Sequence, residues 1–544
     1  MNKKFKVLIF SISVLSGIAA VNINSDKLFE ISKNLEIFIS VYRELNTNFV
    51  DELDPGSMMR KAIDAMTQTL DPYTNFVSES QIESYWINED EKYQGIGAKV
   101  ALVENKLKVI EPFEGGPAIK AGLKAGDQIV GIDGINIENK KLDEINAILR
   151  GLPGTDLKLK IIPNGKSTPE DKSLVRGEVN IPNVPYSGFV TDDVGYISLT
   201  VFTNNASTNI SKALKELKEK NPNMSGVILD LRQNGGGLLH EAVNICNLFV
   251  PQGEVVVTTK GKVKERDQTY KTLAPPLDLD LPLAVLIDKR SASASEIVSG
   301  VIQDMDRGVL IGQRSFGKGL VQNTKELPYN ARLKLTISKY YIPSGRCIQG
   351  VEYENGEPKD IPDSQRSKFK TKNGRLVLDG GGVTPDVKTE ARSLLPVTQA
   401  LIDKYVIYEF ANEYCKNKDS IEKVGTFEFK DFDAFSKYTK NKGFEYELPE
   451  EKHLKEAIKS LEASANKSAI GEIQQTLERI KTSKTNDFNL AKEQIIDELE
   501  KEIITRYYHQ KGKVMQTLDD DADVKKAIEI LRDSKKYKNI LSTK

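Results

Sequence analysis

The chain has 544 residues, a formal net charge of −1 at pH 7, 39% hydrophobic and 28% charged residues, which is ordinary for a soluble protein of about two to four domains. The balanced charge gives no reason to expect a nucleic-acid partner. Three widely spaced cysteines exclude a disulfide framework, and with only three histidines we expect any hydrolase chemistry to use a general base other than histidine.

Residues 1–21 have the pattern of a secretory signal. Lys3, Lys4 and Lys6 precede an apolar centre that is followed by small residues. The apolar stretch is short for a membrane-spanning helix, so an uncleaved membrane anchor is the alternative interpretation. Both interpretations predict that the rest of the chain is exported.

Residues 26–88 are predicted to be mainly helical. Leu28, Ile31, Leu35 and Ile39 recur at the spacing of one helical face. We interpret this region as a packing or dimerisation element.

Residues 89–166 form a different, β-rich module. Glycines alternate with short apolar runs at 107–110, 128–132 and 157–162, and Leu142–Leu149 is the one clear helix. The module has the length of one small domain.

Residues 177–392 are predicted to form an α/β core. A strand at 226–230 is followed by a triple glycine, Gly235–Gly237, and a helix, and a second strand at 283–287 is again followed by a helix. Two such units indicate an α/β domain. The triple glycine is either a tight turn or a set of backbone N–H groups that face an anion.

Ser293 lies where the second strand turns into its helix. Such a turn exposes a side chain beside free helical N–H groups, which suits a serine nucleophile with an oxyanion site. Ser293 and Glu296 also fit a capping box, which would make the serine purely structural. Both interpretations stay open on the local sequence.

Lys318 ends a glycine-rich loop, Gly312–Lys318, with the spacing of a phosphate-binding loop. The next residue is Gly319 rather than the Ser or Thr that holds magnesium, and the following residues look extended, which disfavours nucleotide binding. Lys318 is then either a solvated surface lysine or a desolvated amine. Desolvation lowers a lysine pKa, and a neutral amine can deprotonate a serine hydroxyl.

Residues 393–544 are predicted to be charged amphipathic helices that pack or dock. No catalytic cluster is visible among them.

Several motifs taken together resemble the C-terminal processing (tail-specific) proteases, exported bacterial serine peptidases with a PDZ domain and a Ser-Lys dyad. The resemblance covers roughly residues 71–386. It is carried by Asp230–Leu239, Ser291–Ile297, Gln303-Asp304, Phe316–Gly319 with Val321-Gln322, and Pro343–Arg346.

The resemblance implies a set of catalytic roles. Its spacing of serine and lysine selects Ser293 as nucleophile and Lys318 as general base, with Gln322 orienting the lysine. Ser291 and Ser295 are then structural. The oxyanion hole would consist of the amides of Ala294 and Gly236, with Gly235 close behind. No metal or cofactor is implied.

The β-rich module resembles the family's PDZ domain, and Gly95, Ile96, Gly97 and Ala98 stand where the loop that binds a peptide's C-terminal carboxylate belongs. The implied fold is multidomain α/β: a crotonase/ClpP-like α/β protease core with an inserted PDZ domain and helical N- and C-terminal regions.

The function implied is that of an exported serine endopeptidase, periplasmic or anchored to the outer face of the inner membrane, that acts on proteins with apolar C-termini. A membrane tether through the N-terminus and homo-oligomerisation through either helical region are further expectations. The rival hypothesis is a PDZ-bearing peptide-binding scaffold with an inactive protease core. Whether the PDZ domain occludes the site until substrate binds stays open.

Overall fold

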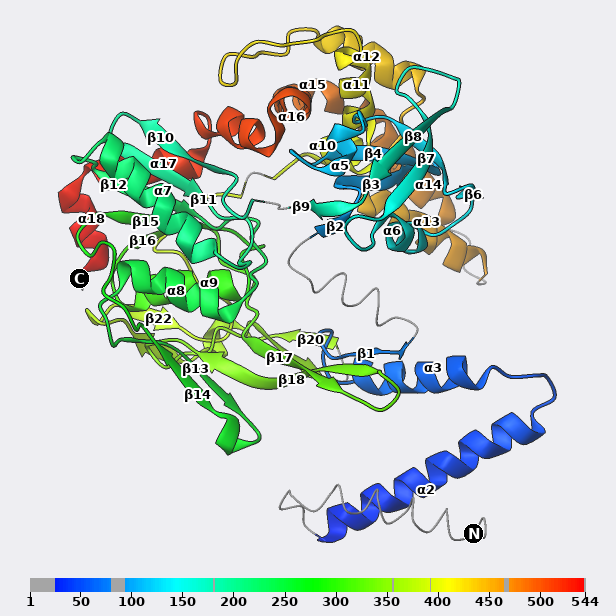
Figure 1. The fold of residues 1–544 in the computed structure, drawn as a ribbon, viewed down its shortest axis with the longest axis horizontal. Helices are drawn as coiled ribbons and strands as arrows, with labels where there is room; N and C mark the ends of the chain where they lie inside the picture. Colours follow the sequence, from blue (N-terminus) through cyan, green and yellow to red (C-terminus); the bar gives the residue numbers. More distant parts are fainter. Residues whose placement is uncertain are drawn as a thin grey trace. The chain divides into compact units, whose positions relative to one another are not determined.

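The computed structural model describes residues 25–79, 93–179, 182–354, 357–391, 393–463 and 469–542 (Figure 1). The export signal expected at 1–21 lies outside these residues. The chain divides into two compact units, one that ends at Leu70 and one that begins at Asp71. Within the described ranges, no helix combines the length and the apolarity needed to cross a bilayer.

The first unit contains the helices α2 (Ser25–Asn48) and α3 (Pro55–Gln68). Asp54 caps α3, because its side chain accepts the N–H groups of Gly56 and Ser57. The predicted helical region reached residue 88, but the structure has a strand, β1 (Asn75–Val77), inside it. Asp71 explains the change, since its carboxylate accepts the Tyr73 and Thr74 N–H groups and so closes a turn before the strand.

The PDZ module is an antiparallel sheet with helix α6 (Leu142–Leu149) packed on it. Buried apolar residues from the sheet and from α6 form one core. The sheet runs in the order β3 (Ala98–Val103), β4 (Lys106–Pro112), β5 (Gln128–Ile132), β7 (Asp156–Ile162) and β8 (Glu170–Val175), with β6 (Ile135–Asn136) beside β5. A short helix, α5 (Pro117–Lys120), and a separate pair, β2 (Tyr93–Gly95) with β9 (Gly177–Val179), complete it. β3 is therefore an edge strand.

A six-stranded sheet forms the centre of the peptidase core. Its order is β10 (Tyr186–Thr191), β11 (Val194–Ser198), β12 (Gly226–Asp230), β15 (Leu283–Ile287), β16 (Val309–Gly312) and β23 (Val387–Lys388). All neighbouring pairs from β11 to β23 are parallel. Strands of such a sheet are buried on both faces, which explains their uninterrupted apolar runs.

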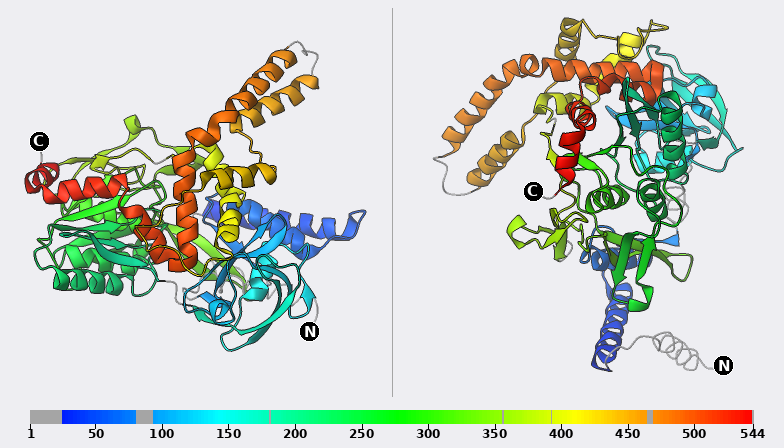
Figure 2. Two further views of the ribbon diagram at one scale, coloured as in Figure 1. Left: turned by 90° about the horizontal axis from the view of Figure 1, so that it is seen from above. Right: turned by 90° about the vertical axis from the view of Figure 1, so that its left-hand side faces the viewer.

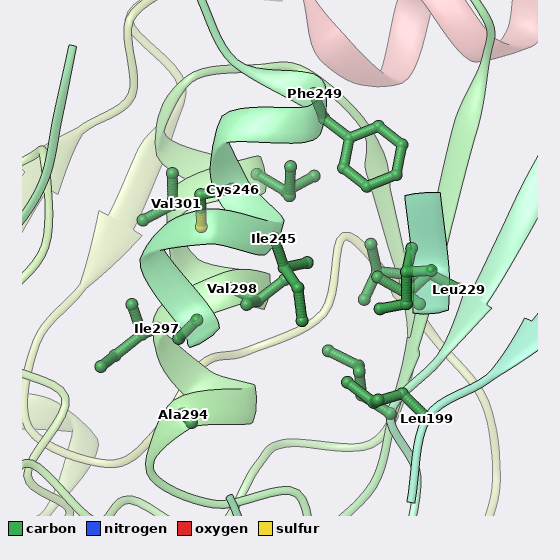
Figure 3. Packing of buried hydrophobic residues seen from close by; sticks show 14 of the residues in the cluster. Leu199, Leu229, Ile245, Cys246, Phe249, Ala294, Ile297, Val298 and Val301 are labelled. Atoms are coloured by element: carbon green, nitrogen blue, oxygen red, sulfur yellow. The ribbon is translucent and has the colours of Figure 1, made fainter. Parts of the chain in front are cut away.

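One face of this sheet is covered by α7 (Ala206–Lys220), α8 (Leu239–Phe249) and α9 (Ala294–Asp304). Figure 3 shows Ile245 of α8 and Val298 of α9 packed toward Leu199 and Leu229 of the sheet side. All four side chains are almost fully buried. This packing fixes the start of α9, where Ser293 stands.

The other face is covered by the last two helices, α17 (Ala522–Arg532) and α18 (Ser534–Leu541), which Figure 2 shows in red. Val524, Ala527 and Ile530 are fully buried in one cluster with Ile228 and Leu286 of the sheet. Residues 393–544 are predicted to be helices that pack or dock, and the last two of these helices pack on the central sheet of the α/β core. Their amphipathic pattern could not identify the surface that they cover.

A second, antiparallel sheet joins β1, β18 (Arg332–Tyr341), β13 (Val255–Gly261) and β14 (Gln268–Lys271), and β17 (Leu320–Glu326) also pairs with β18. The extended segment after Lys318 is therefore a strand, as the sequence predicts. Two short hairpins, β19 (Val351–Glu354) with β20 (Glu357–Asp360) and β21 (Lys368–Lys370) with β22 (Leu376–Leu378), follow.

Five of the seven remaining helices that the structure describes contribute residues to one aromatic and aliphatic core that includes Phe410, Phe435 and Leu499, and the other two, at 449–462 and 470–483, contact each other instead. α16 is not continuous, because His509 has a φ of 54° and a ψ of −158° inside it. The helices are α10 (Pro396–Asp403), α11 (Val406–Cys415), α12 (Phe432–Asn441), α13 (Pro449–Glu462), α14 (Ile470–Ser483), α15 (Asp487–Leu490) and α16 (Lys492–Leu518).

Candidate active site

Ser293 is the N-cap of α9 and has an unusual backbone conformation, with φ 56° and ψ −113°. Non-glycine residues rarely adopt a positive φ, and such strain persists only where the surrounding structure enforces it. The Ser293 N–H donates to Glu296 Oε2 at 2.8 Å, which is the glutamate half of the predicted capping box. The cap thus exists, and it holds the serine in a strained turn.

The two neighbouring serines have other partners. Ser291 Oγ donates to the Leu231 carbonyl and Ser295 Oγ to the Asn234 carbonyl, both at 2.9 Å. Both serines are fully buried, whereas Ser293 is half-buried. Their hydroxyls fasten the start of α9 to the glycine turn that follows β12.

The glycine turn lies directly against Ser293. A Cβ added at Gly236 would come within 2.8 Å of both Ala292 O and Ser293 Cβ, and within 3.0 Å of Ala294 N. The Ala292 N–H also donates to Asn234 O at 3.0 Å. The structure therefore brings together two segments that are far apart in the sequence: the glycine turn and Ser293 with its neighbour Ala294.

The amides of this region differ in their availability. The Gly236 N–H donates to Asn234 Oδ1 at 2.9 Å. Ala294 is the first residue of α9, a position whose N–H has no acceptor within the helix.

We predict that Gly236→Ala lowers the free energy of unfolding by about 1–3 kcal/mol, because its φ of 103° disfavours alanine and the added methyl group meets main-chain atoms. Urea unfolding measures the change. Gly235→Ala is the matched control, since nothing lies within 4 Å of a Cβ there. Equal stability losses in the two variants would contradict the close approach at Gly236.

Lys318 is anchored near Ser293 by its main chain, not by its amine. Its N–H donates to Glu296 Oε2 at 2.8 Å, the same oxygen that accepts the Ser293 N–H. The two main-chain nitrogens are thus within two hydrogen-bond lengths of each other. The amine Nζ lies 4.3 Å from the centre of the Tyr73 ring.

The Lys318 side chain is half-buried, and its pKa is lowered. Burial is the main cause, because it disfavours the charged amine, and the positive charge of Lys334 acts in the same direction. Within the described residues the structure records no hydrogen bond between Lys318 Nζ and Ser293 Oγ.

Glu296 connects the serine and lysine segments. The sequence predicts only a helix cap for this residue. Its carboxylate is fully buried and accepts four hydrogen bonds, from Ser293 N (2.8 Å), Ser315 Oγ (2.5 Å), Gly317 N (2.6 Å) and Lys318 N (2.8 Å). Burial raises its pKa to about 7, and these hydrogen bonds oppose that rise. One side chain therefore organises both loops.

Tyr340 of β18 adds a second connection that sequence reasoning missed. Its hydroxyl is 3.2 Å from the Ser293 carbonyl oxygen and also contacts the Lys318 carbonyl oxygen. A buried tyrosine in a predicted strand must find a partner for its hydroxyl, and this was the only available signal.

Gln322, the third residue assigned from the resemblance, lies on β17. Its side-chain amide donates to Thr336 Oγ1 at 3.2 Å on the neighbouring strand. In the described structure it makes no hydrogen bond with Lys318, so the structure does not join this pair.

The predicted carboxylate loop connects β2 to the edge strand β3. Gly95 ends β2, Ala98 begins β3, and Ile96 between them is fully buried. Two loop carbonyls are used internally, because Ile96 O accepts the Ala118 N–H at 2.7 Å and Gly97 O accepts the Phe113 N–H at 2.8 Å. Among the strands that the structure describes, β3 pairs only with β4.

Across the ranges that the structure describes, no group of three or more His, Cys, Asp or Glu side chains has the arrangement of a metal site. The Glu296 carboxylate, which lies beside Ser293, already accepts hydrogen bonds from four donors.

Three family profiles match the chain in different regions. Residues 193–356 match "Peptidase family S41", residues 94–169 match "PDZ domain", and residues 397–531 match "Probable PDZ-protease, C-terminal helical domain".

Relatives with assigned names match over about two thirds of the chain. A "Carboxy-terminal-processing protease" of Bartonella bacilliformis is 34% identical over 363 residues, which cover 66% of this chain and 82% of the relative. A "Probable CtpA-like serine protease" of Staphylococcus aureus is 32% identical over 360 residues, 65% of this chain and 71% of the relative. A solved structure of a photosystem II D1 C-terminal processing protease is 24% identical, with a TM-score of 0.37, and the match covers 69% of this chain and 95% of that chain.

Proposed function

Because the chain belongs to the S41 family of C-terminal processing serine peptidases and carries that family's PDZ domain, we propose that it is an exported endopeptidase that grips the C-terminal tails of protein substrates and cleaves them with a Ser293–Lys318 dyad. One observation carries the proposal. A single buried carboxylate, that of Glu296, holds the main chains of Ser293 and Lys318 side by side.

The chemistry assigns each group one task. Ser293 Oγ attacks the scissile carbonyl carbon, and its proton passes to the neutral Lys318 amine. The tetrahedral oxyanion is held by the Ala294 N–H and, after the Gly236 N–H turns from Asn234, by that amide too. Collapse expels the amine product, which takes the proton from Lys318. A water molecule then attacks the acyl-enzyme and gives its proton to Lys318, and collapse of the second tetrahedral intermediate returns that proton to Ser293 Oγ and releases the acid product.

The lysine has to move before this sequence can begin. Its amine lies over the Tyr73 ring, and catalytic hydrogen bonds often form only when substrate is bound. We propose that the Lys318 side chain swings from Tyr73 to Ser293, and that Gln322 then exchanges Thr336 for the lysine amine.

The PDZ loop supports recognition of C-termini. An extended peptide can add to the open edge of β3, with its carboxylate bound by main-chain N–H groups of Gly95–Ala98. The resemblance to the family implies that the tails bound there are apolar.

Mass spectrometry of the cleavage products tests the proposal. A folded reporter with an apolar tail should be cut by the enzyme and not by Ser293→Ala, and amidation of the tail's carboxylate should slow the cut. Binding of the free tail without any cleavage would instead identify a peptide-binding scaffold with an inactive core.

Replacing Lys334 by glutamine should move the acidic limb of the kcat/KM profile to higher pH. The charge of Lys334 lowers the Lys318 pKa, and removing that charge lets the pKa rise, so less neutral amine is present at pH 7 and the rate falls a few-fold. Lys339→Gln, on the same strand, is the control. Identical pH profiles for the two variants would contradict a lysine base at position 318.

We further propose that residues 1–21 direct export, with the chain periplasmic or anchored at the outer face of the inner membrane, and that α2 joins a second copy. One face of α2 carries exposed apolar side chains at successive spacings of four, three and seven residues, which are typical of a coiled-coil seam. These residues are Ile31, Leu35, Phe38 and Leu45. Sedimentation of the chain with and without residues 25–50 measures this association; a monomer in both cases would contradict it.

A further inference from the structure

Arg232, in the turn between β12 and the triple glycine, is bound by the far end of the chain. Its Nη1 donates to Asp521 Oδ1 at 3.0 Å and to Asp523 Oδ2 at 2.9 Å, while its Nη2 donates to Asp230 at 2.6 Å. The Arg232 side chain is 19% exposed, so the charge is largely removed from water. A desolvated guanidinium is held strongly by partners that satisfy its donors.

The two aspartates belong to the start of α17. Asp521 caps this helix by accepting the Asp523 and Val524 N–H groups, at 2.9 and 3.1 Å. α17 is fixed on the sheet by buried apolar residues, so its carboxylates are stationary partners for Arg232. Arg232 lies four residues before Gly236. Its partners Asp521 and Asp523 therefore help to hold the glycine turn, although they lie outside residues 193–356, which match the peptidase profile.

The same helical region also grips the PDZ domain. The buried Tyr408 hydroxyl of α11 donates to Val109 O at 2.6 Å and accepts the Gly126 N–H at 2.8 Å. Beside it, Lys108 and Glu409 form an ion pair at 2.7 Å. Both hydrogen bonds of the Tyr408 hydroxyl are made with main-chain atoms of the PDZ domain, so a shift of β4 would be transmitted to α11.

α16 connects these two ends. Arg506 donates to Asn412 Oδ1 of α11 at 2.8 Å, and after the non-helical residue His509 the helix continues to Leu518, just before Asp521. A cavity of about 620 Å³ separates parts of the PDZ domain from α11 and α16. Glu111 of the PDZ domain, Asn412 of α11 and Arg506 of α16 are among the residues that line this cavity.

We propose that Asp521 and Asp523 are positioning residues of the peptidase, which act through Arg232 to hold the glycine turn against Ser293. The helical domain therefore sets the oxyanion site while it holds the PDZ domain. This inference rests on the proposed function, because its effect is on cleavage at Ser293.

The test is Asp521→Asn combined with Asp523→Ala in the full chain. Asn caps a helix as well as Asp does, and Ala favours helix, so α17 is expected to stay folded. Displacing the oxyanion donors should lower kcat for a tailed peptide about tenfold or more and leave KM within about twofold, since substrate grip is unaffected. Phosphonylation of Ser293 by a fluorophosphonate should slow in parallel.

Arg532→Gln is the matched control. It breaks the ion pair with Asp193 at the other end of the same helix, on the same face of the sheet. If both variants unfold at the same temperature and only the aspartate variant loses kcat, the positioning role stands. Equal kcat in the two variants overturns it while wild-type cleavage upholds the proposed function, whereas a wild type with no Ser293-dependent cleavage overturns both.

Discussion

Lys318→Ala is expected to lower kcat/KM for a tailed peptide by about 10⁴-fold or more, as is Ser293→Ala, because each removes one half of a unit in which neither half works alone. Lys318→Arg should not restore activity, since a guanidinium stays protonated and cannot accept the serine proton. The measurements are kcat/KM and the temperature of unfolding.

The fold should survive the lysine substitution. The half-buried amine contacts one ring, and the main-chain N–H that binds Glu296 is retained in any variant. Lys325→Ala, exposed on the adjoining strand β17, is the matched control and should keep full activity. A Lys318→Ala enzyme with more than a tenth of wild-type activity would rule out the dyad.

Glu296→Ala is expected to be the most damaging single change to stability near the site, with a loss of about 3–5 kcal/mol in the free energy of unfolding. It leaves the N–H groups of Ser293, Gly317 and Lys318 without their acceptor in a fully buried place. Because the serine and lysine segments are then no longer joined, kcat should fall more than KM rises. Urea unfolding and steady-state kinetics measure the two effects.

Glu296→Gln separates charge from shape. In the folded chain the pKa of Glu296 is about 7, above its ordinary value of 4.5, so between these two pH values the folded chain holds a proton that the unfolded chain has released. Stability from this group therefore falls as pH rises from about 4.5 to 7, by on the order of 2–3 kcal/mol. The glutamine variant has no ionisable group here and therefore lacks this pH-dependent contribution to stability. Parallel stability–pH curves for the variant and the wild type would show that Glu296 is already ionised throughout that range.

The α/β core was predictable because parallel strands buried on both faces leave continuous apolar runs. The strands at 226–230 and 283–287 match β12 and β15, and the helix at 142–149 matches α6. Family membership, the peptidase activity and the PDZ domain, all inferred from motif combinations, are confirmed.

The connections between segments were not predictable. Glu296 has the same local pattern whether it caps one helix or also binds the distant Lys318 loop, and only the fold decides between them. Likewise, an amphipathic stripe on 522–532 shows that one face is buried, but it does not say against which surface. The strand β1 was missed because three residues after a turn carry too little periodicity.

The covering of the central sheet by α17 and α18 has a consequence for biosynthesis. Sheet residues such as Ile228 and Leu286 are synthesised well before the residues of α17 and α18 that cover them. We expect one face of the central sheet to stay uncovered in the nascent chain until residues 522–541 have been synthesised. A premature stop codon within α17 or α18 would then leave the apolar face of the sheet exposed, and we expect an aggregation-prone product that depends on chaperones instead of a shortened enzyme.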